Sequence, residues 1–177
     1  MLSNNTLIVA AIFLLLVPAG IVAQESTFSD PNVDYSFVLP EAEWKMISKP
    51  SATSPNVEYV YNDRREAHME VRKLTVAKDA FMTDIMRGEE TRLQFLPGYA
   101  AGKEENFAGN LRGNVFNYEF LRTGRNASGR FYFLRADDTT VYVLRFTGDR
   151  DRLKSIRNQT DSIARTFLVK GAKGPQS

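Results

Sequence analysis

The sequence predicts an α+β fold, an α/β/α sandwich in which a mostly antiparallel sheet carries one helix on each face. Three observations support this fold class. The hairpin Gly129–Phe146 is apolar on both faces, so neither face can lie against bulk water. Residues 78–96 and 149–167 have the apolar spacing of amphipathic helices, each of which buries one stripe. The chain order of strands, helix, strands and helix lets one helix cover each face.

The first segment, residues 1–23, has the layout of a secretory signal peptide. Its unbroken apolar run, Leu7–Val17, is followed by the helix breakers Pro18 and Gly20, and we expect cleavage after Ala23. The alternative is an uncleaved membrane anchor, because the apolar residues together nearly span the roughly 30 Å of bilayer hydrocarbon. We therefore expect an exported protein, periplasmic or secreted and free of the membrane, with N-terminal anchoring as the alternative.

The folded domain is expected to span residues 34–169, after a polar linker at 24–33 and before a polar, disordered tail at 170–177. The chain has no Cys, so this domain must be stabilised by a hydrophobic core rather than by disulfides. Alternating apolar residues predict four strands in its first half, and the last two form a hairpin. These strands are 34–40, 43–47, 57–63 and 68–76.

The apolar period then changes, and a helix is predicted over 78–96, with Asp79 as its N-cap and Pro97–Gly98 as its stop. Two strands and a loop are predicted next, at 99–109, 111–122 and 123–129. The last helix, 149–167, is expected to bury a stripe of Leu153, Ile156, Ile163 and Phe167.

The register of the apolar hairpin follows from its DDTT turn, in which we expect Asp137 to face Thr140. Successive side chains of a strand point to opposite faces, so this register divides the hairpin into two apolar sets. One set is Tyr132, Leu134, Ala136, Val141, Val143 and Arg145. The other set is Phe131, Phe133, Arg135, Tyr142, Leu144 and Phe146.

The segment YSFVLPEAEWKMI resembles the opening Y-F-x-x-P-x-x-W signature of PsbP-like proteins, with one extra residue before the Trp. The matching residues are Tyr35, Phe37, Pro40 and Trp44. The segment SIARTF is similar to the closing helix of the same family, so the resemblance covers residues 33–169. It implies an α/β/α sandwich, export and a non-enzymatic binding or accessory role. The wider fold serves the photosystem II extrinsic protein, DcrB-like periplasmic proteins and a nuclear-import factor, so it does not imply photosynthesis.

Charge is distributed unevenly along the chain. Residues 24–111 carry 10 basic and 15 acidic side chains, whereas residues 112–177 carry 13 and 6. A segregated C-terminal half would meet an anionic partner, and the alternative is that the two halves interleave and neutralise each other. The candidate partner-binding residues lie on neighbouring predicted strands and their loop, beside Arg112: Arg122, Arg125, Arg130, Arg135 and Arg145. Export argues against nucleic acid, so we expect a protein or an anionic envelope component.

One candidate metal site is visible. Glu66, His68 and Glu70 alternate along a predicted strand, so they share a face and offer two carboxylates and an imidazole to a divalent ion. The alternative is the solvated face of an edge strand, with Met69 and Val71 pointing inward.

No G-x-S-x-G elbow and no G-x-x-x-x-G-K-[ST] loop occurs in the sequence, so it predicts no enzyme and no cofactor. The favoured hypothesis is an exported, monomeric, non-catalytic binding or accessory domain of PsbP-like fold. The alternatives are a small-ligand or metal-binding module, and an enzyme that uses the cleft between sheet and helix.

Overall fold

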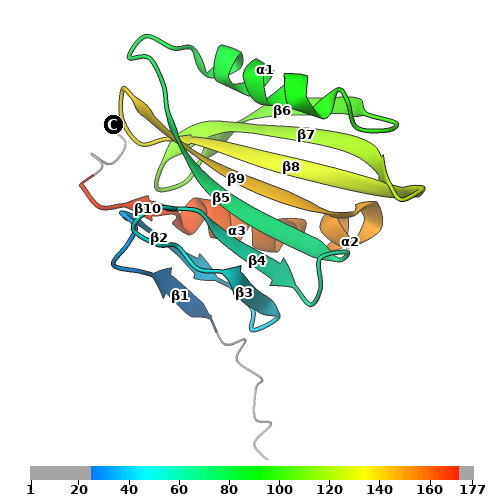
Figure 1. Cartoon of the computed structure of the whole chain (residues 1–177), viewed down its shortest axis with the longest axis horizontal. Helices are drawn as coiled ribbons and strands as arrows, with labels where there is room; N and C mark the ends of the chain where they lie inside the picture. The colour runs from blue at the N-terminus through cyan, green and yellow to red at the C-terminus, as the bar shows by residue number, and fades with distance from the viewer. Residues whose placement is uncertain (1–24, 172–177) are drawn as a thin grey trace, which may run out of the picture.

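The computed structural model describes residues 25–171, which form two antiparallel sheets and three helices (Figure 1). The larger sheet has seven strands in the order β3 (Trp44–Ser48), β4 (Val57–Tyr61), β5 (Ala67–Thr75), β9 (Thr140–Asp149), β8 (Arg125–Arg135), β7 (Arg112–Arg122) and β6 (Ala100–Ala108). The smaller sheet has the order β1 (Ser26–Ser29), β2 (Tyr35–Leu39) and β10 (Leu168–Val169). The helices are α1 (Met82–Leu93), α2 (Arg150–Ser155) and α3 (Arg157–Thr166).

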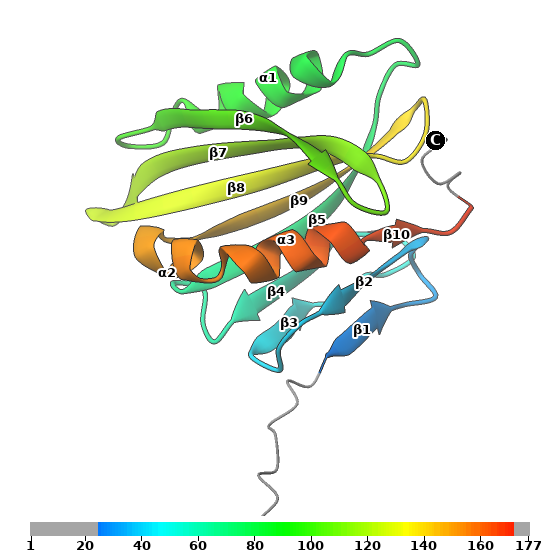
Figure 2. The ribbon, with the colours of Figure 1, turned by 180° about the vertical axis from the view of Figure 1, so that it is seen from behind.

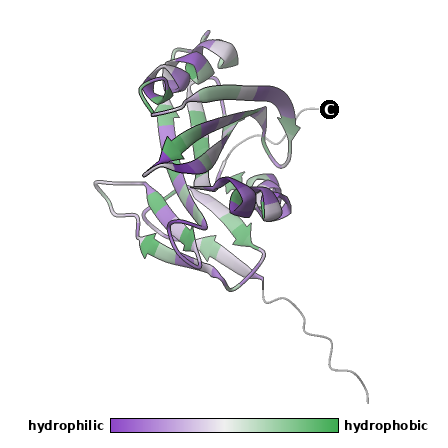
Figure 3. Cartoon of the chain, turned by 90° about the vertical axis from the view of Figure 1, so that its right-hand side faces the viewer, coloured by the Kyte–Doolittle hydropathy of each residue, from purple (hydrophilic) through white to green (hydrophobic). Residues whose placement is uncertain are grey.

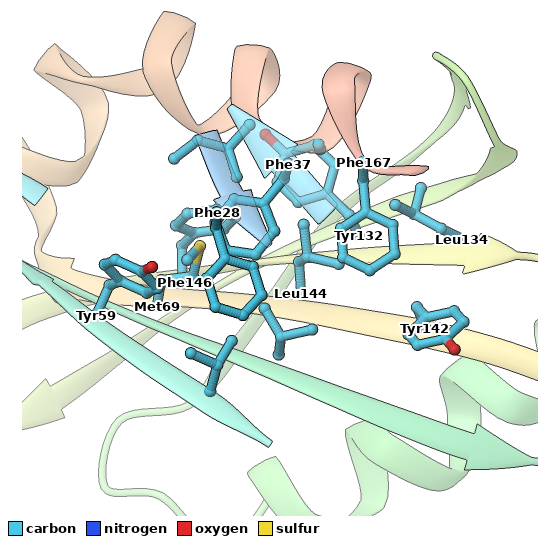
Figure 4. Packing of buried hydrophobic residues seen from close by; sticks show 14 of the residues in the cluster. Phe28, Phe37, Tyr59, Met69, Tyr132, Leu134, Tyr142, Leu144, Phe146 and Phe167 are labelled. Atoms are coloured by element: carbon cyan, nitrogen blue, oxygen red, sulfur yellow. The ribbon is translucent and has the colours of Figure 1, made fainter. Parts of the chain in front are cut away.

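Each face of the seven-stranded sheet has its own hydrophobic core. The α1-side core packs Met86 and Leu93 of α1 on rings such as Phe116 and Phe131. The α2-side core is larger: there α2, α3 and the small sheet pack on the opposite face (Figure 2). Figure 4 shows Phe37 and Phe167 of this core. In Figure 3 both helical layers mix hydrophilic and hydrophobic residues, as expected of helices that bury one stripe.

The apolar hairpin, now β8 and β9, is dry on both faces, as predicted. The side chains at 131–134 and 141–144 are all between 0% and 1% exposed. The α+β class and the mostly antiparallel sheet are confirmed. The expected cover of one helix on each face is not what the structure has, because two helices and a second sheet share one face.

The small sheet explains this difference, and its first strand lies in the segment that we expected to be a linker. Phe28 of β1 is 4% exposed and stacks on Phe37 of β2, with ring centroids 4.8 Å apart. A single buried aromatic among polar neighbours is a weak signal of a strand, because alternation over four residues gives only one or two inward positions. The leader at 1–23 and most of the tail at 170–177 lie outside the described residues.

The predicted register of the hairpin is wrong by one residue. Arg135 faces Val141 and Leu134 faces Tyr142, because the loop is one residue longer than a DDTT turn allows. Tyr142 and Leu144 therefore join Tyr132 in the α2-side core, while Val141 and Val143 join the α1-side core. The prediction that both faces of the hairpin are buried is still correct, because both sets of side chains are apolar.

Three local predictions are also corrected. The expected loop at 123–129 is a two-residue turn, in which Thr123 and Gly124 have φ of 51° and 76°, and β8 starts at once. Positive φ at both positions is typical of a type I′ turn, whose twist matches that of the strands. The first helix has Phe81 rather than Asp79 as its N-cap. The last helix is interrupted at Ile156, where ψ is 18°. Within residues 25–171, no helix has the length and apolarity that crossing a membrane requires.

Candidate functional site

The five candidate arginines do not form one patch. Arg130 is buried, Arg145 lies among the side chains of the α1 side, and Arg135 is at the far end of the hairpin. Strand β8 runs from Arg125 to Arg135, about 33 Å at ~3.3 Å per residue, so its ends cannot contact one ligand group. The expectation of a single basic patch built from these five residues is therefore wrong.

Arg130 is held rigidly on the α2 side of the sheet. Its Nε donates to the Tyr132 hydroxyl at 2.7 Å, one terminal nitrogen donates to Asn117 Oδ1 at 2.7 Å, and the other donates to Asp161 Oδ1 at 2.9 Å. Thr160 lies 2.9 Å from the same hydroxyl. Burial by itself lowers the pKa of Arg130, but Tyr132 and Asp161 raise it overall, so the guanidinium stays charged.

Arg145 and Arg135 make intramolecular contacts. Arg145 Nε donates to the Tyr118 hydroxyl at 3.1 Å, and its guanidinium lies 5.5 Å from the centre of the Phe131 ring. Arg135 donates to the carbonyl oxygen of Ala80 at 2.8 Å and so ties the hairpin to the segment before α1. Both side chains have structural partners, which explains their positions without a ligand.

Arg122 and Arg125 belong to a different group, at the end of the sheet that lies at the right in Figure 1. Arg122 donates to the carbonyl oxygens of Arg64 and Arg65 at 3.3 and 3.0 Å, and pairs with Asp149 at 3.3 Å. The β4–β5 loop, the β7–β8 turn and the start of α2 therefore meet there. Arg152 lines a small pocket together with Asn62 and Glu66 of that loop. We call this surface the basic end: Arg64, Arg65, Arg122, Arg125, Arg150 and Arg152.

The basic end also contains carboxylates, but most of the ion pairs are exposed. Arg64 pairs with Glu58 at 3.1 Å and Arg65 with Asp63 at 3.5 Å, and the two arginine side chains are 62% and 71% exposed. Exposed pairs contribute about 0–1 kcal/mol, so a ligand can replace them at little cost. Arg122 and Arg125 face each other directly across the two strands, a like-charge arrangement that disfavours folding.

The candidate metal residues do not come together as a metal site. His68 Nε2 lies 2.7 Å from Glu58 Oε2 on the neighbouring strand, while Glu66 accepts from Asn62 at 3.0 Å and Glu70 lies 3.6 Å from Arg72 Nε. Among the described residues, no group of three His, Cys, Asp or Glu side chains could hold a metal ion. The hydrogen bond with His68 is the main cause that lowers the pKa of Glu58.

A cleft of about 730 Å³ lies beside α2, over β6, β7 and β8. Its floor includes Ala100, Asn117, Ser128 and Arg130, and the helical wall carries basic side chains. It exists because α2 packs on β8 and β9 and α3 packs on β2, which leaves the α2 side of β6 and β7 partly uncovered (Figure 2). The basic residues of the wall, which the sequence analysis missed, are Arg150, Lys154 and Arg157. Their density in the segment DRDRLKSIR was the available signal.

The chain matches no protein-family model. No curated protein matches it. Solved structures do match: the Ran-binding protein Mog1p of Saccharomyces cerevisiae (TM-score 0.60, 11% identity, 83% of this chain and 96% of that one) and the cyanobacterial PsbP of Synechocystis (0.56, 16%, 86% and 96%). LpqN, involved in cell envelope biogenesis of Mycobacterium tuberculosis, also matches (0.55, 15%, 83% and 91%). At these identities the likeness shows the fold alone, and the fold is PsbP-like, as the sequence resemblance implied.

Proposed function

We propose that this protein is an exported, non-catalytic binding module that contacts an acidic partner protein through its basic end. The observation that carries the proposal is the convergence of three connections, residues 62–66, 122–125 and 149–152, which contribute six arginines to one end of the sheet. A dense, exposed group of arginines attracts a partner of opposite charge and speeds the encounter.

Two further points support a binding role over catalysis. His68, the only histidine, is on the α1 side of the sheet, away from the cleft that an enzyme would use. The solved structures with this fold include a protein named for binding Ran and a PsbP. Export is supported by the leader-like sequence at 1–23, and mass spectrometry tests it: the expected mature N-terminus is Gln24, whereas an intact Met1 would indicate an anchored protein.

The test of the binding role is capture of a partner from envelope extract with the tagged protein. We expect that the triple variant Arg65→Glu, Arg125→Glu, Arg152→Glu no longer retains the partner that the wild type retains. The matched control reverses three exposed charges elsewhere: Lys49→Glu, Lys78→Glu and Arg87→Glu. Equal retention by the basic-end variant and the control would refute the proposal, as would retention that does not weaken with salt.

A further inference from the structure

We propose that the cleft beside α2 binds a carboxylate-bearing segment of the partner protein, with Arg130 at the floor and Arg150, Lys154 and Arg157 along the wall. This inference rests on the proposed function and deepens it, because Arg150 belongs to both the cleft and the basic end. Arg150 therefore links the two proposed surfaces.

The floor offers a positive charge that is fixed before any ligand arrives. The Arg130 side chain is 8% exposed, and the part that remains exposed lines the cleft. A guanidinium has five N–H donors, and Arg130 uses three of its nitrogens on Tyr132, Asn117 and Asp161, one bond each. Two N–H donors are left over, as far as the described residues show, and a carboxylate is the group that such a planar fork matches. Because the side chain is already ordered, binding does not have to immobilise it.

The wall adds three positive charges, one of which, Arg157, lies 3.3 Å from Glu105 and 3.9 Å from Asp161. Arg150 and Lys154 are four residues apart and Arg157 follows three residues later, and all three side chains line the cleft. Arg150 lies 3.8 Å from Glu119 and 3.7 Å from Asp151, and these partners are 59% and 91% exposed. Lys154 has no ion pair within the described part of the chain. The lining thus holds four bases, with Arg130, and two acids, while Asp161 and Glu105 pair with Arg130 and Arg157 from just outside it.

The shape of the cleft suits a peptide better than a bulky ring system. The strands below it contribute the small side chains of Ala100 and Ser128, so a main chain can approach the sheet closely. A volume of about 730 Å³ is within the range of roughly 300–1,000 Å³ that is usual for specific binding sites. The Ser128 hydroxyl can donate a hydrogen bond to, or accept one from, the main chain of a bound peptide.

The first experiment measures binding of a fluorescent, end-blocked peptide of alternating Glu and Gly residues to the purified chain by anisotropy. We expect saturable binding, no binding of the matched Gln and Gly peptide, and at least a tenfold weaker affinity for Lys154→Glu. The matched control, Arg87→Glu, reverses an equally exposed charge on α1 and should stay within twofold of the wild type. Equal binding of the two peptides, or an unchanged affinity for Lys154→Glu, would overturn the proposal.

A second arm separates the two sources of a carboxylate. Free glutarate should displace the peptide only at concentrations at least a hundredfold higher, because a segment makes many contacts and a small acid makes few. If glutarate displaces the peptide at concentrations similar to the dissociation constant of the peptide, the proposal is overturned and the cleft is a site for small acids. Arg130→Lys should weaken the affinity for the peptide about tenfold although it keeps the charge. An unchanged circular dichroism spectrum would show that this variant is folded.

The partner capture described above distinguishes this inference from the proposed function. If Lys154→Glu retains the partner and the basic-end variant does not, the inference about the cleft fails and the binding role stands. If the basic-end variant retains the partner, the proposed function fails regardless of the result with the peptide.

Discussion

The two faces of the seven-stranded sheet are made by the same strands, yet they differ in both packing and charge. The α1 side is covered by one helix whose charges alternate in sign: Asp84 and Arg87 form an exposed pair, and Arg92 pairs with the buried Glu89. The α2 side is covered by two helices and a second sheet, and residues 150–157 carry four bases and one acid. The α1-side core includes 10 buried residues and the α2-side core 24. The side that we propose binds a partner therefore also has the larger hydrophobic core.

The largest difference between the two sides is expected in core truncations. Phe146 is fully buried in the α2-side core and packs edge-on against Trp44 and Tyr132, so Phe146→Ala should cost about 3–5 kcal/mol. Met86 of α1 is buried in the smaller core, and Met86→Ala should cost about 2 kcal/mol. Urea denaturation measures both, and a larger loss for Met86→Ala would reverse the order that we assign to the cores.

Arg130 on the α2 side and Arg145 on the α1 side allow a second comparison of the two faces. Arg130→Met leaves Asp161 without its buried partner and should cost about 3–5 kcal/mol. Arg145→Met removes one hydrogen bond to Tyr118 and the contact of the guanidinium with the Phe131 ring, and should cost about 1–2 kcal/mol. Equal losses in the free energy of unfolding, measured by denaturant titration, would mean that Arg130 is not held as the structure indicates.

A pH-dependent contribution to the stability of the fold is expected just before β2, where Asp34 contacts β5 and β9 of the seven-stranded sheet. Burial raises the pKa of Asp34, but hydrogen bonds from Lys73 and Tyr142 lower it below its usual range overall. A depressed carboxyl pKa stabilises the fold above the unfolded value of about 3.9, and this stability is lost as the pH falls through the folded pKa. Asp34→Asn should therefore lower the melting temperature at neutral pH, and its difference from the wild type should shrink as the pH falls through the folded pKa. A difference that persists in acid would contradict this ionic origin.

The smallest effects on stability are expected from exposed charges on either side. Lys154→Glu and Arg87→Glu should each change the free energy of unfolding by less than about 0.5 kcal/mol, because neither side chain is buried. Matched melting curves of the two variants would show that any difference in binding is not a difference in folding. A loss above about 2 kcal/mol for Lys154→Glu would show that this residue supports the fold instead.

Much of the fold could be predicted because its strongest signals are local. The apolar hairpin, the stripe of Leu153, Ile156, Ile163 and Phe167, and the helix predicted over 78–96 and found at 82–93 all follow from periodicity. The hairpin register could not be predicted, since a loop one residue longer moves every side chain of β9 to the other face and both faces are apolar. The strand β1 could not be predicted either, because it is stabilised by the tertiary contact between the Phe28 and Phe37 rings.

The candidate site was predicted only in part. Arg122 and Arg125 were identified from their position on a predicted strand and the loop that follows it, and both lie at the basic end. Arg64 and Arg65 lie 57 or more residues away in sequence and reach the same end through tertiary contacts alone, which no local pattern encodes. Arg130, Arg135 and Arg145 were grouped with them by residue type, but strand alternation and strand length separate them in space.

Hydrogen exchange of the chain with and without the Glu and Gly peptide tests most directly whether binding belongs to the α2 side. We expect slower exchange in residues 62–66, 122–125 and 149–157 when the peptide is present, and no change in α1 at 82–93. Slower exchange confined to α1, or no change in either region at saturating peptide, would contradict the assignment of binding to the basic end and its cleft.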